Sequence, residues 1–194
     1  RVVHGRLMRW RLIIDAGPRP GVENMAIDQA LLERVKAEGL PSLRFYRWSP
    51  ACLSLGRNQP ASPVLAEAAA RRGLDIARRP TGGAAVLHDH ELTYSVAVPV
   101  GAPGSPRETY RALNRALVAG LRRLGVAAEV AGEPDGGARP LDPSGPCFRG
   151  AAPGEVAVGG LKLVGSAQRR DGRTLLQHGS LLLAGDQALV PEVL

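Results

Sequence analysis

Residues 78–89 read RRPTGGAAVLHD, so two arginines lead into a double-glycine turn that an apolar stretch follows. Glycines permit positive φ and let backbone N–H groups approach a ligand closely. The arginines place fixed positive charge beside the turn. Because a double glycine alone is a weak motif, two interpretations stay open. The turn either binds an anionic or carbonyl-bearing ligand, or it is an ordinary tight turn beside two solvated arginines.

Outside this turn the sequence predicts three helices. Apolar residues recur with helical period over residues 23–38, where Gly39 ends the helix. A second helix begins at Ser62-Pro63, and a third begins at the capping box that Ser105 opens. The side chains expected to face inward are Ile27, Ala30, Leu31 and Val35 in the first helix, and Tyr110, Leu113, Leu117, Leu121 and Leu124 in the third.

Short strands with turn residues between them account for most of the remaining chain. They are expected at residues 10–15, 43–48, 52–55, 74–79, 85–87, 92–98, 126–130, 155–158, 161–168 and 174–183. Gly159-Gly160 and Asp171-Gly172 are the expected hairpin turns. Residues 131–146 form a long loop rich in Gly, Pro and Asp, and such loops are often functional. The pattern predicts a single α+β domain with a largely antiparallel or mixed β-sheet packed by helices.

Composition narrows the class of protein. A chain of 194 residues suits one domain, and its formal net charge of +7 favours an acidic partner. The arginines are dispersed without interleaved aromatic residues, so we expect no nucleic-acid binding. No apolar run reaches the roughly 18 residues of a membrane span, and no secretory signal is visible, so we expect a cytoplasmic protein. Cys52 and Cys147 are expected to stay reduced, and no spacing of histidine and cysteine indicates a metal site.

The longer string RRPTGGAAVLHDHELTYSV resembles the signature loop of the biotin/lipoate protein ligase superfamily. Further motifs of that superfamily occur in the expected order: ENMAIDQALL, LRFYRWSPACLSLGRNQ, PCFRG, VGGLKLVGSAQRR and LLQHGSLLL. The resemblance implies the catalytic fold of that superfamily over residues 9–194, with residues 1–8 as a non-native or disordered extension. Domains of this kind continue past HGSLLL with further helices. We therefore expect the chain to be a C-terminally truncated domain, or one that has lost that part.

Cys147 has two interpretations. On its residue type alone it is more often a small buried hydrophobe. However, a cysteine shortly before GGLKLVGSAQ is similar to the LipM-type octanoyltransferase branch, which uses a thiol nucleophile. That resemblance implies that Cys147 accepts an octanoyl group from octanoyl-acyl carrier protein. The acceptor would then be a lysine of a lipoyl domain, such as that of a glycine cleavage H protein or an E2 subunit. It also implies a monomer that needs neither ATP nor another cofactor.

Lys162 and Lys36 are the only lysines among 25 basic Lys and Arg residues. An exposed lysine on a strand is the ordinary interpretation, but among so many arginines a retained lysine invites a chemical one, because only lysine readily loses its proton. The resemblance implies that Lys162 is an active-site residue. Its expected role is to stabilise the thiolate and the carbonyl oxygen, and to help deprotonate the incoming amine.

The resemblance also implies a substrate pocket built from the glycine turn, the strand after Lys162 and the HGS element. The expected lining residues are Arg79, Thr81, Gly82, Gly83, His88, Gly165, Ser166, Ala167 and His178. On residue type alone each histidine is a hydrogen-bonded structural residue, and we favour that interpretation for His88. Cys52 is expected in the core, and apolar residues within 84–98 are expected to supply an acyl tunnel.

Two other functions stay open on this sequence. The first is an ATP-dependent lipoate or octanoate–protein ligase, which shares the fold and Lys162 but activates a free acid as an adenylate. The second is a non-catalytic member of the fold that binds a carrier protein or nucleic acid. Cys147 separates the first alternative from the transferase, because a ligase tolerates its replacement by alanine and a transferase does not.

Overall fold

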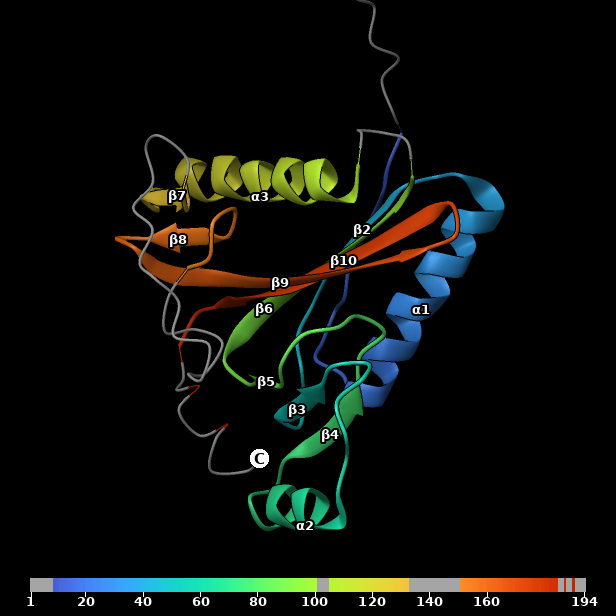
Figure 1. Ribbon diagram of the computed structural model, residues 1–194, viewed down its shortest axis with the longest axis vertical. Helices are drawn as coiled ribbons and strands as arrows, with labels where there is room; N and C mark the ends of the chain where they lie inside the picture. The colour runs from blue at the N-terminus through green and yellow to red at the C-terminus, as the bar shows by residue number, and fades with distance from the viewer. Residues whose placement is uncertain (1–8, 101–104, 133–150, 185–186, 188–189, 191–194) are drawn as a thin grey trace, which may run out of the picture.

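The structure is a computed structural model that describes residues 9–100, 105–132, 151–184, 187 and 190. Within these residues the chain forms ten strands and three helices (Figure 1). In chain order they are β1 (Arg11–Ile14), α1 (Gly21–Glu38), β2 (Ser42–Tyr46), β3 (Cys52–Leu55), α2 (Pro63–Arg71), β4 (Asp75–Arg78), β5 (Val86–His88), β6 (Glu91–Pro99), α3 (Pro106–Arg123), β7 (Ala128–Val130), β8 (Val156–Val158), β9 (Leu161–Asp171) and β10 (Thr174–Leu182).

The strands form two mixed sheets. The larger has the order β1-β2-β6-β10-β9-β8-β7, in which only β1 and β2 pair in parallel. The smaller has the order β4-β3-β5, with β3 parallel to β4 and antiparallel to β5. The predicted α+β fold with a largely antiparallel, mixed sheet is therefore confirmed.

The helices cover separate parts of the two sheets (Figure 1). In the main core, Val118 and Leu121 of α3 pack with residues of β6 to β10 such as Val156. Helix α1 packs Leu32 and Val35 against Ala97 and Leu176 of the large sheet. Helix α2 lies against the small sheet, where Leu65 joins a core with Leu53, Leu55 and Leu87. No helix of the described ranges is long and apolar enough to cross a membrane.

Local signals in the sequence set the ends of these elements. Both hydrogen bonds of the capping box between Ser105 and Glu108 are present at the start of α3. Gly39 ends α1 in the left-handed conformation with φ of 68°. Gly159 and Gly160 both have positive φ, which a two-residue hairpin turn between β8 and β9 requires. These three predictions are confirmed.

Two side chains expected to face inward do not. Ala30 is exposed, because α1 instead turns Asn24, Asp28 and Leu32 toward the sheets. Leu124 is 80% exposed, because it is the C-cap residue just beyond the last turn of α3. A helical period in the sequence therefore located both helices but misplaced the limits of their buried faces.

Candidate functional site

A cavity of about 220 Å³ lies where the two sheets meet. Both sheets and the glycine turn contribute to its wall. The lining residues are Met25, Tyr46, Trp48, Ser54, Arg79, Gly83, Ala84, Val86, His88, Thr93, Glu155, Lys162, Gly165, Ser166, Ala167, His178, Gly179 and Ser180. Apolar surface with a few polar groups at fixed positions is typical of a small-molecule site.

Most of the residues expected at a substrate pocket lie in this wall. They are Arg79, Gly83, His88, Lys162, Gly165, Ser166, Ala167 and His178. Thr81 and Gly82 do not line the cavity: Thr81 is fully buried behind the turn, and Gly82 is exposed. Val86 and Ala84 are the members of the expected apolar stretch 84–98 that reach the cavity. Cys147 lies outside the described residues.

Lys162 forms an ion pair at the cavity wall. Its Nζ donates to Glu155 Oε1 at 2.8 Å, and the two side chains are only 10% and 13% exposed. The other carboxylate oxygen of Glu155 accepts from the backbone N–H of Ala152 at 2.9 Å. A charge-assisted bond shielded from water fixes the ammonium group more firmly than a surface pair would.

Glu155 was not expected at the site. It immediately precedes β8, which pairs with β9 so that Ala157 lies opposite Lys162. The hairpin that the sequence does predict therefore brings Glu155 and Lys162 together. A search for carboxylates next to the partner strand of Lys162 would have found Glu155.

Arg79 shapes the glycine turn from inside. Its guanidinium donates to the carbonyl oxygen of Ser54 at 2.9 Å, of Gly82 at 2.9 Å and of Ala84 at 2.6 Å. The end of β3 crosses the turn so closely that a Cβ at Gly56 would lie 2.0 Å from the carbonyl oxygen of Gly83. The turn is therefore a fixed part of the cavity wall, and Arg79 brings a buried positive charge to it.

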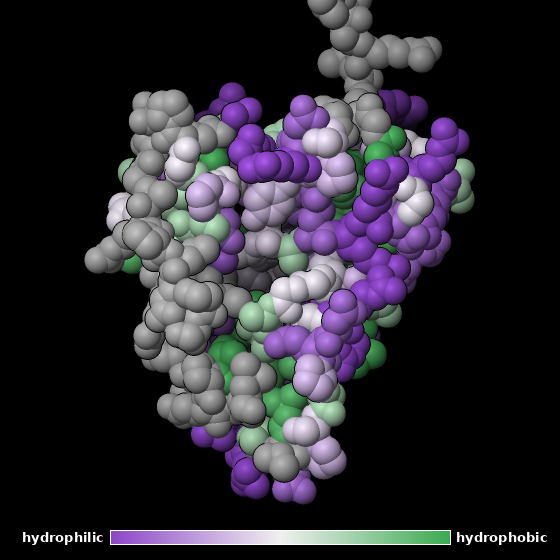
Figure 2. Space-filling model, viewed as in Figure 1, coloured by the Kyte–Doolittle hydropathy of each residue, from purple (hydrophilic) through white to green (hydrophobic). Residues whose placement is uncertain are grey.

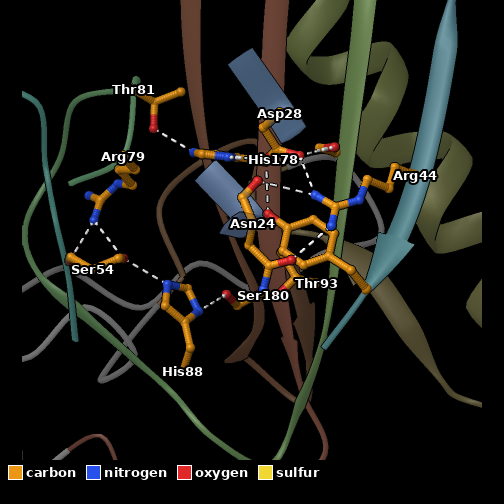
Figure 3. Close-up of polar contacts among 12 residues, drawn as sticks. Asn24, Asp28, Arg44, Ser54, Arg79, Thr81, His88, Thr93, His178 and Ser180 are labelled. Atoms are coloured by element: carbon orange, nitrogen blue, oxygen red, sulfur yellow. Dashed lines mark hydrogen bonds and ion pairs between the residues drawn. The ribbon is translucent and has the colours of Figure 1, made fainter. Parts of the chain in front are cut away.

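His178 connects the glycine turn to α1 (Figure 3). Its Nδ1 lies 3.0 Å from Asp28 Oδ2, and its Nε2 lies 2.6 Å from Thr81 Oγ1. Since a carboxylate only accepts hydrogen bonds, we assign the proton to Nδ1, which leaves Nε2 to accept from the threonine hydroxyl. The pairing of β10 places His178 between Ser95 and Ala167, at the centre of the large sheet.

Asp28 is fully buried and is satisfied by four side chains. Arg44 donates at 3.0 Å, Tyr46 at 2.9 Å and Ser95 at 2.8 Å, in addition to the contact with His178. Burial and the nearby Asp28 carboxylate raise the pKa of the Tyr46 hydroxyl well above its usual range, which keeps it a donor. Asp28 thus links α1, β2, β6 and β10 behind the cavity (Figure 3).

His88 is the centre of a second set of buried hydrogen bonds, at the end of β5 in the smaller sheet. Its Nδ1 lies 2.8 Å from Glu91 Oε1, and its Nε2 lies 2.7 Å from the hydroxyl of Ser54. The imidazole also stacks on Trp48 with 4.0 Å between ring centroids. These contacts fit the hydrogen-bonded structural histidine that we favoured. Ser54 is 0% exposed, so its hydroxyl supports the wall and is not presented to solvent.

Cys52 lies in the core, as predicted. It is 0% exposed, and burial raises the pKa of its thiol to about 12. A thiol with that pKa stays protonated near neutral pH, and only the thiolate is an effective nucleophile. Cys52 is therefore excluded as a nucleophile in this site.

Comparison with known proteins agrees with this geometry. The family model described as the lipoyl protein ligase A/B catalytic domain matches residues 20–194. The chain belongs to this family. It is 45% identical over 187 residues to octanoyltransferase LipM of Symbiobacterium thermophilum, covering 93% of this chain and 68% of that protein. It is 47% identical over 179 residues to octanoyltransferase LipM of Moorella thermoacetica, covering 90% of this chain and 65% of that protein.

Solved structures of the family have the same fold. Lipoate-protein ligase A bound with ATP matches with a TM-score of 0.72 and 27% identity, covering 95% of this chain and 71% of that one. A bipartite lipoate protein ligase studied with its E2 lipoyl domain from Thermoplasma acidophilum matches with a TM-score of 0.67 and 26% identity, covering 92% and 63%. The chain spans about two thirds of the length of the octanoyltransferases above.

Proposed function

We propose that this chain moves an octanoyl group from acyl carrier protein to a lysine of a lipoyl domain, through a thioester on Cys147. Octanoyl transfer in protein lipoylation rests on 41–47% identity with octanoyltransferases over 84–94% of the chain. The observation that supports the mechanism is the Lys162–Glu155 pair, which holds a cation in the wall of the cavity.

The reaction has two balanced steps. In the first, the Cys147 thiol loses its proton, the thiolate attacks the carbonyl carbon of the donor thioester, the bond to the carrier sulfur breaks, and the carrier leaves as a thiol with the proton that Cys147 lost. In the second, the ε-amine of the acceptor lysine attacks the same carbon, the bond to Cys147 breaks, and the amine proton returns to the thiolate. Thioester exchange is nearly isoenergetic and amide formation is downhill, so ATP is not consumed.

We propose that Cys147 acts at this site, because it lies close in sequence to Glu155, which lines the cavity. Ala151 is fully buried and packs with Ala131 and Ala157. Cys147 lies outside the described residues and precedes Ala151 by four positions, a span of at most about 14 Å. The next residue, Ala152, donates its backbone N–H to Glu155, the partner of Lys162. The nucleophile and the cation are thus joined by a short segment of chain.

Lys162 supplies positive charge where the chemistry needs it. A cation beside a thiol lowers its pKa and increases the fraction of thiolate. The same ammonium group can stabilise negative charge that develops on the carbonyl oxygen. Glu155 is proposed to position Lys162, because its carboxylate is held at both oxygens.

The remaining residues are proposed to shape the acyl site. Gly165, Ser166 and Ala167 present small side chains on β9, which leaves room for the acyl chain beside Lys162. The glycine turn forms the opposite wall, where Gly83 lines the cavity. His88 and His178 are proposed to hold the walls in place through their buried hydrogen bonds. Thr81 and Gly82 are proposed to contribute through the conformation of the turn.

The donor, acceptor and location follow from this chemistry. We propose octanoyl-acyl carrier protein as the donor, and as the acceptor a lipoyl domain of a glycine cleavage H protein or an E2 subunit. A free thiol nucleophile works in a reducing compartment, so we propose a cytoplasmic protein. We further propose that it acts as a monomer.

Intact-mass spectrometry tests the intermediate. The protein is incubated with octanoyl-acyl carrier protein without ATP, and Cys147→Ala is treated in parallel. We expect an octanoyl adduct on the unsubstituted protein alone, and we expect hydroxylamine to remove it because thioesters are sensitive to that reagent. An equal adduct on Cys147→Ala would reject Cys147 as the nucleophile.

An ATP-dependent ligase is the second candidate, favoured by the fold that the chain shares with lipoate-protein ligase A bound with ATP. The two candidates differ in what they need. A ligase would modify a lipoyl domain only with free octanoate and ATP, and Cys147→Ala would retain that activity. The transferase would not depend on free octanoate and ATP, and its Cys147→Ala variant would be inactive.

A further inference from the structure

An open groove of about 470 Å³ lies next to the cavity, on the side of α1. Its apolar lining residues are Val22, Met25 and Ala26 of α1, together with Ala77 and Pro80. Its charged lining residues are Arg57, Arg78, Arg79 and Arg169, and no Asp or Glu lines it within the described ranges. An amphipathic groove with charge of one sign is complementary to a ligand that is anionic at one end and uncharged along its length.

The groove and the cavity are neighbours. Met25 and Arg79 line both of them, so an extended ligand can lie in the groove and place one end in the cavity. In Figure 2, hydrophilic side chains gather over α1, the helix that supplies Val22, Met25 and Ala26 to the groove. A groove that shares lining residues with a reaction cavity suits a flexible arm better than the surface of a folded domain.

Two of the arginines have donors to offer an anion. Arg57 is exposed, and the interaction that the structure gives its guanidinium within the described residues is the electrostatic attraction of Asp171. The Nε of Arg169 is buried and lacks a hydrogen-bond partner among the residues that the structure describes. Another nitrogen of the same guanidinium, Nη2, forms an ion pair with Asp171 Oδ2 at 3.5 Å, so Nε is the donor left for a ligand. A buried N–H donor without an acceptor is unfavourable, and a phosphate oxygen would satisfy it.

The other two arginines are fixed in the wall. One nitrogen of Arg78 donates to the carbonyl oxygens of Gly56 at 2.9 Å and Gln59 at 2.6 Å. Arg79 donates to carbonyl oxygens of the glycine turn. Carbonyl groups are neutral, so these bonds orient both guanidinium groups without cancelling their charge. Arg78 and Arg79 therefore add positive potential to the groove, which favours an anion beside Arg57 and Arg169.

We propose that this groove binds the phosphopantetheine arm of the acyl donor, with its phosphodiester at Arg57 and Arg169. The arm lies along Val22 and Ala26 and delivers the thioester past Met25 and Arg79 into the cavity. This inference rests on the proposed function, because it assumes a donor thioester carried on such an arm. Guanidinium groups bind phosphate oxygens in a bidentate geometry that lysine cannot reproduce.

A binding measurement tests this without requiring acyl transfer. Phosphopantetheine and pantetheine, which differ only by the phosphate, are titrated calorimetrically into the full chain and into the double variant Arg57→Gln/Arg169→Gln. We expect the unsubstituted protein to bind phosphopantetheine at least about tenfold more tightly, since one charge-assisted hydrogen bond corresponds to about a tenfold change in affinity. We expect the double variant to lose that preference. Equal affinity for both ligands, or an unchanged preference in the variant, would overturn the proposal.

A matched control and a kinetic arm complete the test. Arg71→Gln removes an arginine that is 68% exposed on α2 and lies outside the groove, and it should leave the phosphate preference unchanged. In acylation of Cys147, the double variant should raise KM for octanoyl-acyl carrier protein about tenfold. It should leave the rate with octanoyl-pantetheine unchanged. If the variant instead raised only KM for the lipoyl domain, the groove would serve the acceptor and the proposal would be wrong. Acylation failing with every donor would reject the proposed function, while the phosphate preference would still be measured.

Discussion

Asp28→Asn is the sharpest test of the polar network behind the cavity. The carboxylate of Asp28 is 0% exposed and accepts hydrogen bonds from Arg44, Tyr46, Ser95 and His178. Asparagine has the same shape, but one of its two terminal groups donates. Oδ1 can keep the contacts with Arg44 and Ser95, whereas an amide nitrogen at the Oδ2 position faces the N–H of His178. Two donors then meet in a buried site, unless the imidazole changes tautomer.

The size of the stability loss depends on the ion pairs that Arg44 keeps in the variant. Removing one partner of a buried ion pair typically destabilises a protein by about 3–5 kcal/mol. Arg44 retains Asp15, whose Oδ2 lies 2.7 Å from Nη2, so we expect a loss near the lower limit, about 3 kcal/mol. For a chain of this length that corresponds to a fall in Tm of about 6–12 °C. Transfer activity at 25 °C should fall as well, because His178 would no longer hold Thr81 and the glycine turn in place.

Urea denaturation followed by circular dichroism measures the stability change. Glu38→Gln is the matched control. Glu38 lies on the same helix as Asp28, but its carboxylate is 40% exposed and pairs with Arg34 of that helix and with Arg11 of β1. We expect its unfolding midpoint to match that of the unsubstituted protein. If Asp28→Asn also matched it, the reasoning that the buried carboxylate organises four elements would be refuted.

Three further changes probe individual contacts. Glu155→Gln should lower kcat/KM for Cys147 acylation about tenfold, because it removes the charge on the partner of Lys162. Glu129→Gln, on the neighbouring strand β7, should leave kcat/KM unchanged, and equal rates in both variants would reject a role for the pair. Cys52 should resist iodoacetamide at pH 8 in the folded protein, because burial raises the pKa of its thiol to about 12 and the thiolate forms only as pH approaches that value. Peptide mapping that found Cys52 rapidly alkylated would contradict this. Gly56→Ala should destabilise the protein by about 1–3 kcal/mol, because its Cβ would meet the carbonyl oxygen of Gly83. A Cβ at Gly82 would have no atom within 4 Å, so Gly82→Ala should leave the stability unchanged, and equal unfolding midpoints of the two variants would show that the turn is not fixed as described.

Local patterns predicted the elements of this fold well. Capping residues and positive-φ glycines act within a few residues of chain, so Ser105, Gly39 and the Gly159-Gly160 turn could be read directly from the sequence. These signals need no knowledge of what packs against them.

The polar network could not be predicted in the same way. Asp28 lies in a helix where a charged residue ordinarily faces solvent, and its contact with His178 joins residues 150 positions apart. Its burial is stable only because donors from three strands converge on it, which no local pattern records. Glu155 is an intermediate case, since the predicted hairpin placed it near Lys162 but residue type alone gave it no role.

Transfer from the isolated acyl-enzyme shows whether the thioester on Cys147 is an intermediate. Protein carrying octanoyl on Cys147 is separated from donor, then mixed with a lipoyl domain in a rapid-quench instrument without ATP. We expect the octanoyl group to move to the acceptor lysine at least as fast as steady-state turnover, and the mass of the enzyme to return to its unmodified value. An acyl-enzyme that persists while the lipoyl domain stays unmodified would show that the thioester is not an intermediate.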